Sequence, residues 1–177
     1  FSDMPKGSYS YSVERSTTDM GRAVTSADAL AALKIAAGRS DINSDGFDIA
    51  PYQLIAADVT GDGRVTSIDA LSILKRAAKR DDGAEVEWVF VDEAQDFYNE
   101  DAGSFTLHRR NVNYEEEIYL ELGDDTELNL VGIMKGDVTG NWSSRSSEAQ
   151  YVDQSHFVEI ATQINTTVEQ WHVDEII

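Results

Sequence analysis

The sequence predicts an α+β fold, in which a pair of loop–helix repeats packs with a small antiparallel β region. Helical patterns with repeated sequence fill the first part of the chain, from about Ala23 to Arg80. After a break at residues 81–83, segments with alternating apolar and polar residues follow, which indicates strands. The expected strands are 86–91, 103–110, 117–123 and 127–136, the last two joined by a hairpin turn at 123–125. The N-terminal segment 7–14 is expected to pack with them.

The segment from Asp58 to Asp69 reads DVTGDGRVTSID and has the spacing of a calcium-binding loop. Oxygen-bearing side chains stand at its first, third, fifth and twelfth positions, and a glycine is sixth. An acidic turn before a helix would explain the charge but not this spacing. Val65 is expected to face the core beside the loop. The predicted ligands are Asp58, Thr60, Asp62, Asp69 and the backbone carbonyl of Arg64.

The pattern V-T-S-x-D-A-L occurs twice, and each copy begins a helical segment. Thr25 and Thr66 are expected to cap the two helices, with Asp28 and Asp69 completing a capping box three residues later. Counting back from Asp28 gives a loop that offers few carboxylates, of which Asp19 is the candidate ligand. For Asp28, capping alone and capping with metal binding both remain open. The second helix is expected to carry Leu71, Leu74, Ala77 and Ala78 on one face.

Two further segments resemble the first half of a calcium loop. Asp41, Asn43 and Asp45 have the right spacing, but the twelfth position is Tyr52, so an Asx-rich turn is the alternative. The other segment repeats the D-V-T-G opening late in the chain, and no helical pattern follows it. Its candidate ligands are Asp137, Thr139 and Asn141.

A calcium loop followed by one helix, present in two copies, resembles the repeat of dockerins. The resemblance covers repeats at about 17–38 and 58–80, with an inserted acidic loop at 41–52. It divides the chain into a dockerin-like module (1–82), a small β region (83–142) and a linker with the start of a further segment (143–177). The tail from 143 fits a helix or a strand equally well.

The dockerin resemblance implies a non-catalytic module that binds Ca²⁺ and docks onto a cohesin-like domain. Dockerins belong to secreted bacterial systems for polysaccharide breakdown, so an extracellular or cell-surface location in a bacterium or archaeon is expected, with polysaccharide reached through the parent protein. Leu33 and Leu74 are either partner contacts or core. The implied partner-binding residues are Ser26, Ala27, Lys34, Ser67, Ile68 and Lys75.

The composition agrees with an extracellular calcium-binding module. The formal net charge of −19 makes nucleic acid and anionic membranes unfavourable partners. The absence of cysteine leaves no disulfide or thiolate metal site, and no apolar run is long enough for a membrane span. Because the sequence begins at Phe1, we interpret it as a fragment of a larger secreted or surface protein.

Two other functions are weighed against docking, and catalysis is not expected. The VDEAQD segment at 91–96 resembles a helicase magnesium motif, but the phosphate-binding loop that such an enzyme needs is missing. A calcium-stabilised spacer without a partner would bury the repeat helices against the strands. A carbohydrate-binding module would expose coplanar aromatic rings from Trp88, Trp142 or Tyr98.

Overall fold

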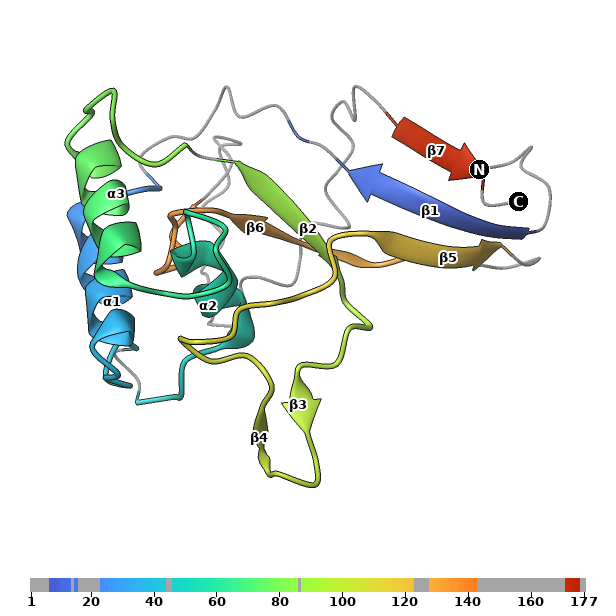
Figure 1. The fold of residues 1–177 in the computed structure, drawn as a ribbon, viewed down its shortest axis with the longest axis horizontal. Helices are drawn as coiled ribbons and strands as arrows, with labels where there is room; N and C mark the ends of the chain where they lie inside the picture. Colours follow the sequence, from blue (N-terminus) through green and yellow to red (C-terminus); the bar gives the residue numbers. More distant parts are fainter. Residues whose placement is uncertain are drawn as a thin grey trace, which may run out of the picture.

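The structure is a computed structural model that describes residues 7–13, 15, 23–43, 46–85, 87–122, 128–142 and 171–175. These residues form a mixed α+β fold of helices and small antiparallel sheets (Figure 1). The helices are α1 (Ser26–Ala36), α2 (Pro51–Ala57) and α3 (Ser67–Ala77). The strands are β1 (Gly7–Val13), β2 (Trp88–Asp92), β3 (Tyr98–Asn99), β4 (Ser104–Phe105), β5 (Ile118–Leu122), β6 (Leu130–Met134) and β7 (Trp171–Glu175).

Helices α1 and α3 begin as the repeated sequence predicts. Thr25 and Thr66 are the N-caps, and each forms a capping box with the aspartate three residues later. The two helices lie side by side at one end of the molecule, with the C-terminus of α1 next to the N-terminus of α3 (Figure 1). The two copies of the repeat therefore form an antiparallel helix pair.

The apolar face of α3 that carries Leu71 and Leu74 is turned toward solvent. Leu71 and Leu74 are 52% and 46% exposed, whereas Ala70 and Ile73 are buried. The buried positions of α3 are Asp69, Ala70 and Ile73, because the capping carboxylate of Asp69 turns inward and fixes which side of the helix faces the core. Leucines that could have formed core are thus left on the outer face.

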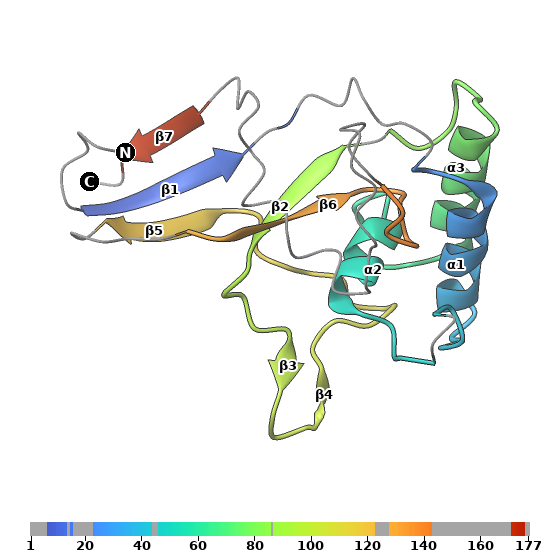
Figure 2. The same ribbon diagram turned by 180° about the vertical axis from the view of Figure 1, so that it is seen from behind.

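The strands form separate small sheets. β1 lies between β5 and β7, and β2 pairs with β6, both in antiparallel fashion. Strands β3 and β4 form a short hairpin that projects away from the helices (Figure 1). From the other side, α2 lies between β6 and the α1–α3 pair (Figure 2). In the tail, 171–175 is a strand, and residues 143–170 lie outside the described residues.

The predicted hairpin between 117–123 and 127–136 is not formed in the described part of the chain. The first of these strands, β5, pairs with β1, and the second, β6, pairs with β2. Every residue of β6 is buried, so this strand needs cover on both faces and lies in the core beside α2. In β5, buried Ile118 is followed by exposed Tyr119, which suits a sheet with one face in water.

One hydrophobic core connects the helices and strands across the expected boundary at residue 82. Its members come from α1, α2 and α3 and also from β2, β6 and the loops beyond. Val65 is 2% exposed and belongs to this core, as the sequence predicted. The helical module and the β region therefore fold around the same interior. Among the residues that the structure describes, no helix is long and apolar enough to cross a membrane.

Candidate metal centre

The segment 58–69, named here the contiguous loop, is built around the carboxylate of Asp58. Asp58 follows α2 directly and is only 2% exposed. Its Oδ1 accepts a hydrogen bond from the Gly61 amide (3.0 Å), and its Oδ2 accepts one from the Gly63 amide (2.9 Å). Gly63 has a φ of +77° and its Cα faces Asn113 Oδ1, which a Cβ would meet at 2.8 Å, so only glycine fits this bend.

Asp69 closes the contiguous loop from the first turn of α3. It is fully buried, and its Oδ2 accepts hydrogen bonds from the amide and the hydroxyl of Thr66. Its Oδ1 accepts from the amide (3.1 Å) and the hydroxyl (2.8 Å) of Thr60. A carboxylate has about four acceptor positions, so protein donors satisfy all of them at Asp69. The residue both caps the helix and fastens the loop to it.

Asp28 makes the same contacts in α1, but with a partner from the far end of the chain. Its Oδ2 accepts from the amide and hydroxyl of Thr25. Its Oδ1 accepts from the amide (2.8 Å) and hydroxyl (2.7 Å) of Thr139. Thr139 therefore occupies at Asp28 the place that Thr60 occupies at Asp69.

The segment around Thr139 reproduces the turn of the contiguous loop. Asp137 is 3% exposed and accepts hydrogen bonds from the amides of Asn141 (3.0 Å) and Trp142 (2.8 Å), as Asp58 does from the amides at the corresponding positions. Gly140 has a φ of +66°, close to the +68° of Gly61. Residues 137–142 together with 24–28 therefore form a second loop, named here the divided loop.

The divided loop replaces the predicted first site. Sequence counting assigned to Asp28 a ligand upstream, Asp19, which lies outside the described residues. The structure instead brings Asp28 next to Asp137, Thr139 and Asn141, which sequence reasoning had placed in a separate half-loop. The sequence contains a signal for this pairing. The repeat at 24–38 has a helix without a good loop, and the segment at 137–142 has the start of a loop without a helix.

Each loop brings two buried carboxylates close together. Burial raises the pKa of Asp58, the negative charge of Asp69 acts in the same direction, and the ammonium of Lys135 opposes both. Burial also raises the pKa of Asp137, to about 6, and the neighbouring charge of Asp28 contributes to this rise. Two like charges in a buried site repel each other, so both loops hold a local excess of negative charge.

In the contiguous loop, one pair of oxygens has the spacing of neighbouring calcium ligands, and a second pair is at hydrogen-bond distance. Thr60 Oγ1 lies 2.8 Å from Asp69 Oδ1 and 3.4 Å from Asp58 Oδ1. Ligands at about 2.4 Å from one cation and at right angles to each other are about 3.4 Å apart. The donor set contains only oxygen, as calcium requires. In the divided loop, Thr139 Oγ1 and Asp28 Oδ1 are similarly close.

The carboxylates are fewer than the sequence suggested. Among the described residues, no three His, Cys, Asp or Glu side chains come together closely enough to hold a metal ion. Asp62 is exposed at the rim of the contiguous loop rather than beside Asp58 and Asp69. Each loop therefore offers two buried carboxylates and a threonine hydroxyl, with Asp62 or Asn141 at its solvent side.

The predicted loop at 41–52 is a hydrogen-bonded turn. The Asp41 carboxylate forms ion pairs with Arg39 (2.7 Å) and Lys34 (3.6 Å), and the hydrogen bond from Arg39 lowers the pKa of Asp41 to about 2. The Asn43 side chain exchanges hydrogen bonds with Gln53 at the start of α2. Asp45 lies outside the described residues. Asp41 and Asn43 thus serve as structural groups, and we assign no ion to this turn.

The predicted partner-binding residues lie on the outer side of the helix pair. Ser26, Ala27, Ser67 and Ile68 are exposed at the N-termini of α1 and α3. Lys34 and Lys75 are half-buried and pair with Asp41 and Asp82. Leu33 and Leu74, which could have been core, are 48% and 46% exposed.

The aromatic residues do not form a flat platform. Trp88 and Trp142 meet edge to face, with an angle of 86° between their rings and the guanidinium of Arg15 over both. Tyr98 is exposed, but its ring contacts Phe105 at an angle of 80° on the β3–β4 hairpin. The coplanar surface expected of a carbohydrate-binding module is therefore not formed by these rings.

Known proteins offer no assignment of this site. No protein-family model matches the chain, and no curated protein or solved structure matches it. The function is therefore inferred from the residues and their geometry.

Proposed function

We propose that this chain is a non-catalytic, calcium-binding docking module of dockerin-like construction. The observation that carries the proposal is the equivalence of the two loops. Asp58, Thr60 and Asp69 in one loop correspond in hydrogen bonding to Asp137, Thr139 and Asp28 in the other. Such a pair of loops, each followed by a helix, supports the dockerin-like pairing of two calcium repeats.

The charge of the loops supports calcium as their ligand. Asp58 with Asp69, and Asp137 with Asp28, place two carboxylates in each largely buried loop. A bound Ca²⁺ supplies two positive charges and a demand for several oxygen ligands. In the contiguous loop, Asp58, Thr60, Asp69 and the outer Asp62 would hold the ion. In the divided loop, the corresponding residues are Asp137, Thr139, Asp28 and Asn141.

In both loops the threonine hydroxyl can serve an aspartate and an ion together. The hydroxyls of Thr60 and Thr139 donate to the carboxylates of Asp69 and Asp28. A hydroxyl that donates one hydrogen bond keeps lone pairs for a cation. Thr60 and Thr139 can therefore hold the aspartates in place and present oxygen to the ion at the same time.

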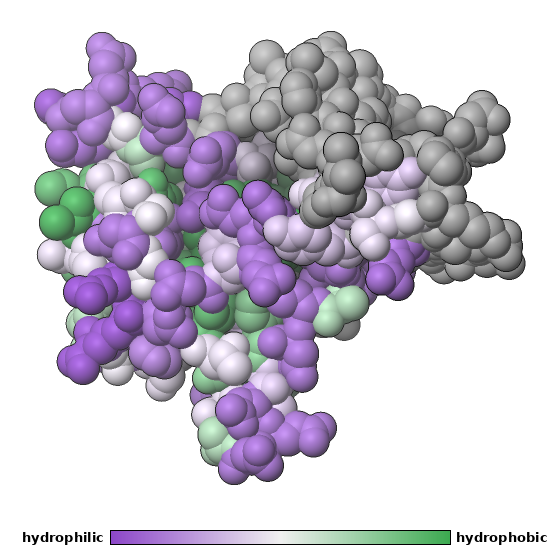
Figure 3. Space-filling view, turned by 45° about the vertical axis from the view of Figure 1, so that its right-hand side comes forward, coloured by the Kyte–Doolittle hydropathy of each residue, from purple (hydrophilic) through white to green (hydrophobic). Residues whose placement is uncertain are grey.

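The outer face of the α1–α3 pair supports docking. Leu30 and Leu33 on α1, with Ile68, Leu71 and Leu74 on α3, are all 46–64% exposed. In the space-filling view, apolar atoms lie at the edge of the molecule where the helix pair is found, with hydrophilic atoms around them (Figure 3). A face that is both apolar and accessible is what a protein partner requires. The spacer hypothesis predicted that these side chains would be buried.

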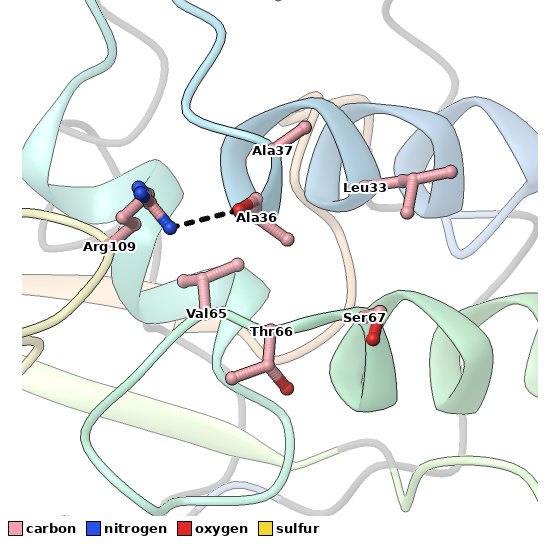
Figure 4. A pocket seen from close by; sticks show the side chains of 7 residues that line it. All are labelled: Leu33, Ala36, Ala37, Val65, Thr66, Ser67 and Arg109. Carbon is pink, nitrogen blue, oxygen red and sulfur yellow. Dashed lines mark hydrogen bonds between the residues drawn. The ribbon is translucent and has the colours of Figure 1, made fainter.

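A groove beside this face adds a recess for a partner side chain. It has a volume of about 340 Å³ and lies between the end of α1 and the start of α3 (Figure 4). Leu33, Val65 and Ser67 line it from the two helices. Arg109 forms one wall and donates a hydrogen bond to the carbonyl of Ala36 (3.0 Å). This hydrogen bond joins the Arg109 wall to the last turn of α1.

The charges of the helix pair indicate the chemistry of the partner. Asp28 and Asp69 are buried, so the accessible charged side chains of α1 and α3 are cationic, in contrast to the chain as a whole. They are Lys34, Lys75 and Arg76. Lys34 and Lys75 already pair with Asp41 and Asp82, so the apolar side chains carry the recognition, and a cohesin-like domain with an apolar patch is the proposed partner.

Melting curves and binding to cohesin domains test the proposal in two steps. The melting temperature of the chain is measured in calcium, in magnesium and in EGTA, and a rise with calcium alone is expected. Binding to a panel of purified cohesin domains is then measured by calorimetry, in calcium and in EGTA. Leu74→Glu should abolish binding, whereas the control Arg110→Met, at an exposed position that does not line the groove, should not. Absence of a calcium effect on both properties would overturn the proposal.

A structural module that needs no metal is the second candidate. It is favoured by Asp28 and Asp69, whose carboxylates are each satisfied by four protein donors. In this case the loops would serve only to fasten α1 and α3 to the core. An unchanged melting temperature between calcium and EGTA would support it.

A further inference from the structure

Lys135 is a buried cation beside the contiguous loop. It follows β6 directly, is 4% exposed, and reaches across to donate a hydrogen bond from Nζ to the backbone carbonyl of Asp58 (2.6 Å). Its ammonium also lies 5.9 Å from the centre of the Tyr114 ring. A buried ammonium is unfavourable unless negative charge lies near it. The carboxylate of Asp58 is close enough for Lys135 to be the strongest charged influence on it.

The divided loop has the opposite environment. The charged group that acts most strongly on Asp137 is the carboxylate of Asp28, which has the same sign. Among the described residues, the carbonyl of Asp137 accepts a long hydrogen bond from the Gly140 amide (3.4 Å), whereas the carbonyl of Asp58 accepts one from the ammonium of Lys135 (2.6 Å). The two loops are thus alike in hydrogen bonding but differ in charge balance.

We propose that Lys135 is a positioning residue that gives the contiguous loop a fixed positive charge, so that this loop keeps its shape without calcium. Beside the divided loop, the described residues place the guanidinium of Arg15 over the ring of Trp142 (4.7 Å) but no ammonium on the carbonyl of Asp137, so we expect this loop to depend more on the ion. The inference rests on the proposed function and specifies how calcium controls it. Calcium organises α1 and its junction with 137–142, while α3 and the contiguous loop form a preassembled half.

The same charge has a second consequence. Lys135 repels a divalent cation that enters the contiguous loop, so it lowers the calcium affinity of that loop while it stabilises the loop in the absence of the ion. A residue with a purely structural role would stabilise the loop in both states. The two roles of Lys135 therefore predict effects of opposite sign, which a single substitution can reveal.

The substitution Lys135→Met keeps most of the length of the unbranched side chain and removes its charge. The matched control is Arg110→Met, which removes one positive charge at an exposed position. In EGTA, the melting temperature of Lys135→Met should fall by at least about 3 °C below that of the control. Calcium is then titrated while the amide resonances of Gly63 and Gly140 report the contiguous and the divided loop separately.

The midpoint calcium concentration at Gly63 should fall by at least about threefold in Lys135→Met, and that at Gly140 should stay within about twofold. An unchanged or higher midpoint at Gly63 in folded protein would overturn the inference. If wild type shows no response to calcium at either amide, the proposed function fails. Equal melting temperatures of Lys135→Met and the control in EGTA would overturn the inference about Lys135 and leave the proposed function standing.

Hydrogen exchange in the wild-type chain covers the case in which Lys135→Met does not fold. The amides of Gly63 and Trp142 donate to equivalent carboxylates, Asp58 and Asp137. In EGTA, the Gly63 amide should exchange at least about tenfold more slowly than the Trp142 amide, because only the contiguous loop keeps its shape. Equal exchange, or slower exchange at Trp142, would contradict the role assigned to Lys135.

Discussion

Asp28 at the start of α1 accepts two hydrogen bonds from Thr139, which is 111 residues away in the sequence. This contact completes the first repeat with a segment that follows all of the other helices and the strands β1 to β6. The loop of the first repeat is therefore divided between distant parts of the chain. Its formation requires that β6 be in place, since residues 137–142 follow that strand.

The Asp28–Thr139 contact should contribute measurably to stability. Thr139→Val removes a hydroxyl that donates to a buried carboxylate, so the free energy of unfolding should fall by about 1–3 kcal/mol. Urea denaturation measures this change. Thr60→Val removes the equivalent hydroxyl at Asp69 and should have a similar effect, while Ser26→Ala at an exposed position should change little. A loss below about 0.5 kcal/mol for Thr139→Val would contradict the proposed junction.

The predicted module 1–82 should not fold alone. It lacks residues 137–142, and it also lacks the core residues of β2 and β6, among them Val91, Val131 and Ile133. Circular dichroism and amide spectra of a chain ending at residue 82 should show little ordered structure, even in calcium. A chain ending at residue 142 retains these parts and is the control. A cooperative melt of the shorter chain would contradict the shared core.

The exposed leucines should matter more for binding than for stability. Leu33→Ala and Leu74→Ala should change the free energy of unfolding by less than about 1 kcal/mol, since both side chains are about half exposed. Ile73→Ala, in the core, should lower it by about 2–5 kcal/mol. Denaturation curves of the three variants distinguish the two groups. A loss of about 3 kcal/mol for Leu74→Ala would show that this side chain is part of the core in solution.

Stability without calcium should decrease as the pH rises. The pKa of Asp137 is about 6 in the folded chain, against about 3.9 for an ordinary aspartate, so the folded state binds this proton more tightly than the unfolded state. The resulting stabilisation is complete below about pH 4 and is lost as the pH rises through 6. In EGTA, wild type should lose about 1–3 kcal/mol between pH 4 and 7 relative to Asp137→Asn, measured by urea denaturation at each pH. Parallel pH profiles for the two proteins would be inconsistent with a raised pKa at Asp137.

The local structure was largely predictable from the sequence. The capping boxes at Thr25 and Thr66 and the inward position of Val65 follow from short-range rules, and the structure confirms them. Expected strands at 86–91, 117–123 and 127–136 are present with shifted ends. In each case the deciding interactions lie within a few residues of one another.

The pairing of distant segments was not predictable by counting along the chain. Counting along a continuous loop matches Asp28 with residues just before it and gives Glu148, not Asp28, as the twelfth residue of the loop that begins at Asp137. Strand β6 is buried along its whole length, so its pairing with β2 depends on how the complete core is assembled. The exposure of Leu71 and Leu74 similarly depends on the inward turn of Asp69, which a pattern of apolar residues does not reveal.

A calorimetric calcium titration of the full chain, with three variants, tests the central claim most directly. Wild type should bind two ions, because both loops hold two buried aspartates and a threonine hydroxyl in equivalent positions. Asp58→Asn should remove the contiguous site and Asp28→Asn the divided one, leaving one ion in each variant, and the double variant should bind none. Binding of a single ion by wild type, unaffected by Asp28→Asn, would contradict the divided loop, and the absence of any calcium binding would contradict the account as a whole.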